Sequence, residues 1–129
     1  MRIRRKLSVT LPPTVYDRIV AQGGSNKSMV ITNALIRLFD LVEAERPRLA
    51  ERFTPEQQQL LIAEADISME QAGFIPWRSW YAAASAFQAH GHPELAETIA
   101  AMNEAELMTL SHYIERHLRT ERVGDIFEP

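Results

Sequence analysis

The stretch from Lys6 to Leu35, KLSVTLPPTVYDRIVAQGGSNKSMVITNAL, decides the fold that the sequence predicts. Basic residues precede this stretch, and polar and apolar residues alternate from residue 2 to residue 11. The even positions are polar or cationic: Arg2, Arg4, Lys6, Ser8 and Thr10. The odd positions, apart from Arg5, are apolar: Ile3, Leu7, Val9 and Leu11. A period of two predicts a β-strand with one buried face and one solvated face, which ends at the proline pair 12–13 because proline donates no backbone hydrogen bond.

Two helices are predicted after this strand. The first spans about residues 13–22 and ends at the glycine pair 23–24, as helices often do. Asn26 suits the N-cap of the second helix, which spans about residues 27–44 until Pro47 breaks the pattern. Its apolar residues recur at helical spacing and form a wide stripe: Ile31, Ala34, Leu35, Leu38, Phe39 and Val42.

The rest of the chain predicts a small helical domain. After a charged connector at 46–53, residues 54–120 contain four helical segments, and residues 121–129 form a tail in which Ile126 and Phe127 are candidates for docking. Capping-box patterns begin two of the helices: Thr54 with Gln57, and Asn103 with Glu106. An aromatic cluster near Pro76 is expected in the core: Trp77, Trp80 and Tyr81. The expected fold class is therefore mainly α, with one strand and two helices before about four more helices.

Charge is distributed unevenly along the 129 residues, whose net charge is −3. Residues 1–28 carry six lysines and arginines against one aspartate, a balance of +5, so the other 101 residues carry −8. A basic N-terminal part on an acidic body indicates that only this part contacts a polyanion such as nucleic acid. The chain has no cysteine, which fits a reducing compartment. Neither a signal peptide nor a membrane-length apolar run is recognisable, so we expect a cytoplasmic protein without a membrane partner.

The first 45 residues contain too little apolar material for a stable monomer. A lone strand also needs a partner for its backbone groups, and no second alternating segment is found. The sequence therefore predicts a homodimer in which two strands pair and four helices cover their apolar face. The expected dimer core consists of Leu7, Val9, Leu11, Ile31, Leu35 and Leu38.

This order of strand, prolines, helix, glycine turn and NKS-led helix resembles the ribbon-helix-helix DNA-binding family of the Arc and CopG repressors. The resemblance covers about residues 3–44 and rests on KLSVTLP and GSNKSMVITNAL. It implies an intertwined dimer whose β-ribbon enters the DNA major groove. The residues that it implies for base reading are Lys6, Ser8, Thr10 and Arg4. Those expected to bind DNA phosphates are Asn26, Lys27, Ser28, Arg2 and Arg5, the first three at a helix N-terminus that offers free N–H groups.

The functional expectation is a sequence-specific transcriptional repressor from a bacterium, plasmid or phage, with double-stranded DNA as its partner and no enzymatic activity. Two alternatives remain: a plasmid partition or conjugation accessory protein, and the antitoxin of a toxin–antitoxin pair. Residues 54–120 are expected to join dimers into tetramers or to bind an effector or a protein partner. We expect no cofactor and no metal, because His112 and His117 lie five residues apart and do not share a helix face.

Overall fold

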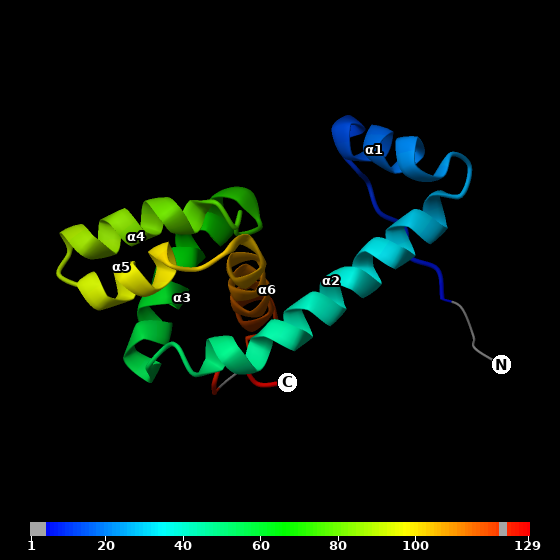
Figure 1. Cartoon of the computed structure of the whole chain (residues 1–129). Coiled ribbons are helices and arrows are strands. Elements are labelled where there is room, and N and C mark those ends of the chain that lie inside the picture. The colour runs from blue at the N-terminus through cyan, green and yellow to red at the C-terminus, as the bar shows by residue number, and fades with distance from the viewer. Residues whose placement is uncertain (1–4, 122–123) are drawn as a thin grey trace. The chain divides into compact units, whose positions relative to one another are not determined.

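A computed structural model describes residues 5–121 and 124–129, which form six helices (Figure 1). Their bounds are α1 Pro13–Gly23, α2 Lys27–Ala50, α3 Pro55–Ala72, α4 Ser79–Ala89, α5 Pro93–Ala100 and α6 Glu104–Thr120. The chain divides into two compact units, Met1–Leu38 and Phe39–Pro129. The boundary falls within α2, so this helix contributes residues to both units.

The predicted N-terminal strand and the ribbon-helix-helix fold are wrong. No strand occurs among the described residues, and residues 5–12 are neither helical nor paired. A strand exists only through hydrogen bonds to a neighbouring strand, and alternating polarity supplies no such neighbour. The structure is all-helical in the described ranges, so the expectation of a mainly α chain is correct only for its helical part. The predictions for Arg2, Ile3 and Arg4 concern residues outside those that the structure describes.

The unit Met1–Leu38 contains the predicted pair of helices. The proline pair begins α1, and Gly24 ends it with a φ of 57°, which favours glycine. Gly23 is needed for a second reason: a Cβ built there would lie 2.2 Å from Cγ2 of Val30 on α2. The two helices therefore approach closely at this turn, where the N–H of Asn26 donates to the carbonyl of Gly23 at 2.9 Å.

Helix α2 does not break at Pro47, contrary to the prediction, and continues to Ala50. Val42 and Leu49, seven residues apart on one helix face, are buried within the second unit. Arg46 also donates to the carbonyl of Phe127, at 3.3 Å. Burial of two large apolar side chains is worth about 1.5–3 kcal/mol each, which offsets much of the roughly 3 kcal/mol cost of an interior proline.

The unit Phe39–Pro129 holds the buried core. Helices α4 and α5 pack against each other, as do α3 and α6 (Figure 1). The capping boxes predicted at Thr54 and Asn103 are both present, with each side chain accepting from the backbone N–H three residues on. Most large core side chains with negligible exposure come from α3, α5 and α6: Leu61, Leu95, Ile99, Leu107, Leu110, Tyr113 and Ile114.

The C-terminal tail is part of this core. Ile126 and Phe127 are each 1% exposed, and the Phe127 ring stacks on that of Phe53 at 6.1 Å. Arg116 of α6 holds the segment in place by donating to the carbonyls of Ile126 and Glu128. Ile126 and Phe127, which the sequence offered only as candidates for docking in a loose tail, are therefore part of the core.

Candidate functional site

The N-terminal segment presents side chains of both alternating sets to solvent. The predicted base-reading residues Lys6, Ser8 and Thr10 are exposed, as is Arg5. Leu7 and Val9, which the prediction placed in a dimer core, are 88% and 61% exposed. Within one chain, residues 5–10 thus form an arm that carries cations, hydroxyls and apolar groups together.

The start of α2 carries the predicted phosphate-binding residues. Asn26 and Ser28 are exposed, and Lys27 is half-buried. The Lys27 ammonium lies over the ring of Tyr16, 5.6 Å from its centroid, which holds the charge beside the helix start. The first N–H groups of a helix and its dipole favour an anion at this end. The local structure therefore supplies a positive charge next to free backbone donors.

Most of the large apolar side chains that are exposed in the described residues belong to the unit Met1–Leu38. They are Leu7, Val9, Val15, Tyr16, Val20, Met29, Leu35 and Ile36. Of the predicted dimer core, Leu11, Ile31 and Leu38 are partly covered within the chain. The fully buried core belongs entirely to residues after Leu38 in the described parts of the chain. This unit therefore leaves much of its apolar side-chain surface uncovered within one chain.

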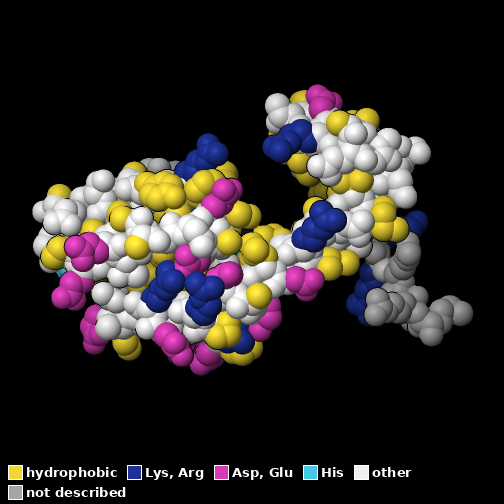
Figure 2. Space-filling view, in the orientation of Figure 1, with side chains coloured by type: hydrophobic (Ala, Val, Ile, Leu, Met, Phe, Trp, Pro, Cys, Tyr) yellow, Lys and Arg dark blue, Asp and Glu magenta, His cyan; other side chains and the backbone are white. Residues whose placement is uncertain are grey.

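Charge separates along the same boundary. Residues 1–38 contain seven lysines and arginines and one acid, a balance of +6, whereas residues 39–129 have seven against sixteen, a balance of −9. Acidic side chains are conspicuous over the second unit in Figure 2. The first unit thus combines the positive charge with the uncovered apolar surface.

Two buried or bridging polar contacts organise the second unit, and the sequence pattern did not single them out. Glu106, which is 3% exposed, caps its own helix and pairs with Arg52. Glu43 of α2 bonds Arg46 at 3.0 Å and accepts from the Tyr113 hydroxyl at 3.1 Å, which together lower the pKa of its carboxyl. The contacts of Glu106 with Arg52 and of Glu43 with Tyr113 join residues far apart along the chain, so no local spacing predicts them.

The aromatic cluster near Pro76 divides between core and surface. Trp80 is buried, and its indole N–H donates to the Ser111 hydroxyl at 2.8 Å, as expected of a core residue. Trp77 is only half-buried, and Tyr81 is 47% exposed. The core prediction is correct for Trp80 and wrong for Tyr81, because consecutive residues of a helix point to different sides and Trp80 is the one that faces α6.

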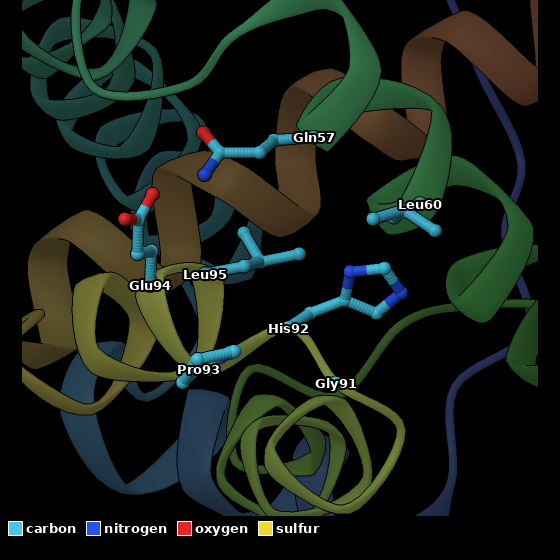
Figure 3. Close-up of a pocket in the computed structure, with 7 residues that line it drawn as sticks. All are labelled: Gln57, Leu60, Gly91, His92, Pro93, Glu94 and Leu95. Carbon is cyan, nitrogen blue, oxygen red and sulfur yellow. The ribbon is translucent and has the colours of Figure 1, made fainter.

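A shallow pocket of about 300 Å³ lies between α3 and the start of α5. Figure 3 shows Leu60 and the ring of His92 on one side, with Gln57 and Glu94 on the other. The side chains around it include no serine, threonine, lysine or arginine. His92 and Glu94 are therefore the titratable groups of this pocket, and none of the residues that line it carries a hydroxyl or amine nucleophile.

The histidines of the described segments do not gather into a metal centre. No group of three or more histidines and carboxylates close enough to hold a metal ion occurs there. His90 instead contacts the carbonyl of Ala86 at 2.7 Å, and His112 packs edge-on against Tyr113 with 5.1 Å between ring centroids. Burial lowers the pKa of His112, and the nearby Arg116 charge acts in the same direction.

Comparison with known proteins adds no assignment. No protein-family model matches the chain, and searches of curated proteins and of solved structures return no match. No helix in the described part of the chain is both long and apolar enough to cross a membrane.

Proposed function

We propose that the chain is a cytoplasmic, homodimeric regulator of transcription that binds double-stranded DNA through the unit Met1–Leu38. The observation that carries the proposal is the coincidence on this unit of a +6 charge balance and an uncovered apolar surface. Positive charge concentrated on one part of a protein attracts the DNA backbone even when the whole chain is acidic. The apolar surface fits a second copy of the same unit.

The arm and the start of α2 have separate roles in this proposal. Lys27 and Ser28 bind backbone phosphates together with the first N–H groups of the helix, which fixes the position of the protein on DNA. In the arm, Lys6, Ser8 and Thr10 contact base edges, since lysine donates to guanine and hydroxyl groups serve several bases. The arginines near the start of the chain add phosphate contacts.

Dimerisation supports the proposal energetically. Every residue of α1 is at least partly exposed, so the helix pair has little to hold it together alone. A second copy that covers Val15, Val20 and Leu35 removes their apolar surface from water. Each Å² of apolar surface buried in this way stabilises the dimer by about 25 cal/mol. Folding of this unit is then coupled to association and depends on protein concentration.

The test is fluorescence anisotropy of labelled double-stranded DNA from the region upstream of the chain's own gene, titrated with the full chain at several salt concentrations. We expect the logarithm of the binding constant to fall linearly with the logarithm of the salt concentration. The slope should be about −0.9 for each phosphate neutralised. Lys27→Ala is expected to weaken all sequences alike and to reduce that slope by about one. Lys6→Ala is expected to lower the preference for the upstream region over unrelated DNA.

The matched control is Arg48→Ala, which removes an exposed arginine from the second unit, where it pairs with Glu45 at 3.6 Å. Its affinity and salt slope should equal those of the unaltered chain. Absence of any salt-dependent binding by the unaltered chain, or an equal loss in Arg48→Ala and Lys27→Ala, overturns the proposal.

A further inference from the structure

The second unit carries an exposed aromatic surface where α3 is connected to α4. We call it the aromatic–arginine surface, and it consists of Phe74, Trp77, Arg78 and Tyr81. Phe74 is 51% exposed and Tyr81 is 47% exposed. The ring of Tyr81 meets that of Trp77 edge-on, with 6.3 Å between centroids, and the Arg78 guanidinium lies 5.0 Å from the Trp77 centroid. The rings of Trp77 and Tyr81 and the Arg78 cation thus contact one another in this surface.

The backbone beneath this surface is fixed by the core. The N–H of Ile75, a residue 4% exposed, donates to the Glu115 carboxylate of α6 at 2.8 Å. Arg119 of the same helix donates to the carbonyl of Gly73 at 2.9 Å, and Trp80 is held by its bond to Ser111. A surface ordered in advance loses little conformational entropy when it is covered.

The charges around this surface are not neutralised within the described residues. Arg78 forms no ion pair there, and neither do Asp66 and Glu70, which are exposed near the C-terminal end of α3. The last turn of α3 contains no basic residue. The C-terminal end of a helix carries partial negative charge, which the Arg119 guanidinium meets at the Gly73 carbonyl, and Arg119 forms no ion pair with Asp66 or Glu70. A cation, two acids and exposed rings are therefore available together for an external partner.

We propose that a second copy of the chain docks on the aromatic–arginine surface through a two-fold contact. A two-fold contact requires surfaces that complement each other, and Arg78 of this surface with the exposed carboxylates of Asp66 and Glu70 on α3 provides both signs of charge. Arg78 of each copy meets Asp66 and Glu70 of the other, while the rings cover one another. The contact deepens the proposed function, on which it rests for its biological role: it joins two DNA-bound dimers into a tetramer.

The size of the surface indicates the strength of this contact. Aromatic side chains bury about 150–250 Å² each, so the half-exposed Phe74 and Tyr81 offer roughly 100 Å² each. Stable complexes bury about 800 Å² on each partner. The contact is therefore weak between free molecules and becomes effective when adjacent DNA sites hold two dimers near each other.

The test is analytical ultracentrifugation of the full chain without DNA over a wide concentration range. We expect the mass to rise one step, from dimer to tetramer, at high concentration. Arg78→Glu should weaken this step about tenfold or more through like-charge repulsion. Exchanging the signs on both sides, in the triple variant D66R/E70R/R78E, should restore it. Arg48→Glu, an equal change of charge at another exposed arginine of the same unit, should leave it unchanged.

A second measurement separates this inference from the proposed function. On DNA with two adjacent sites, Arg78→Glu should keep its affinity for one site and lose cooperative filling of the second. A chain that associates through this surface without binding DNA overturns the proposed function and leaves the inference standing. If the chain binds DNA but the unaltered chain and Arg78→Glu show the same mass distribution in ultracentrifugation, the inference is overturned. Tyr81→Ser, which changes an exposed side chain, provides an apolar counterpart with the same expected loss.

Discussion

The two units of this chain differ in how far their apolar side chains are buried. Phe39–Pro129 buries a continuous core in which Leu107, Leu110 and Ile114 have no exposed surface. Met1–Leu38 instead leaves its apolar side chains in solvent and carries the positive charge. A unit that needs a partner to complete its core can couple folding to binding. The comparison teaches that the unit with the buried core holds the acidic charge, whereas the unit with the uncovered apolar side chains holds the positive charge.

The largest expected effect comes from removing core volume on the stable side. Leu110→Ala should lower the free energy of unfolding by about 2–5 kcal/mol, because it leaves a cavity at a fully buried position. Leu35→Ala, at a position 45% exposed, should barely change that transition and should instead weaken association of the chain. Urea unfolding followed by circular dichroism at two protein concentrations distinguishes the two. Equal destabilisation by both variants would contradict the contrast between the units.

A smaller effect is expected at the helix turn of the first unit. Gly23→Ala places a methyl group against Val30, at 2.2 Å from Cγ2, and should separate α1 from α2 at a cost of about 1–3 kcal/mol. The measurement is amide hydrogen exchange, which should rise in α1 and stay constant in α6. The double variant Gly23→Ala with Val30→Ala removes the clash and should recover part of the protection. Unchanged exchange in α1 after Gly23→Ala contradicts the close approach.

Loss of a helix cap should have an effect of about 0.5–2 kcal/mol on the second unit. Asn103→Ala removes the oxygen that accepts from the N–H of Glu106 at 2.9 Å. It also disturbs Glu106, whose carboxylate bonds the N–H of Asn103 and pairs with Arg52. The temperature at the midpoint of thermal unfolding should fall in Asn103→Ala. In Asn103→Asp, which can still cap the helix, it should stay close to that of the unaltered chain. A cap loss that alters DNA affinity without altering this midpoint runs against the division between the units.

The smallest effect concerns acidic pH. The pKa of His112 is lowered mainly by burial, so the folded state holds the neutral imidazole and the unfolded state binds a proton more readily. Stability from this group is present above the unfolded pKa, about 6.5, and is lost as pH falls through the folded pKa. His112→Gln should flatten the pH dependence of unfolding between about pH 7 and 5. His90→Gln, at an exposed position, serves as the control and should not.

Several local elements followed from short sequence patterns. Both capping boxes, the glycine pair 23–24 and the helix start at Pro13 lie where the sequence placed them. These features depend on bonds within a few residues, so neighbouring side chains determine them. The charge contrast also followed directly, since it needs only the positions of ionisable residues along the chain.

The expectations that the structure corrects depended on contacts between distant residues. Alternation in residues 2–11 indicated a strand, yet a strand needs a neighbouring strand, and the described residues pair with none. Pro47 indicated a break, yet Leu49 is buried and Arg46 bonds the tail, so α2 continues. The candidate DNA-binding residues were chosen from spacing and resemblance. Those that the structure describes are exposed, apart from the half-buried Lys27, and their role remains a prediction for the experiments above.

By itself, the sequence determined the helix ends, the acidic helical body and the basic N-terminal part, because local hydrogen bonds and formal charge are properties of short segments. Only the tertiary structure decided which apolar residues were covered. It buried Trp80, Ile126 and Phe127, left Leu7 and Tyr81 in solvent, and paired Arg52 with Glu106. Burial depends on which faces meet in space, and those meetings join residues too far apart along the chain for any local pattern to specify.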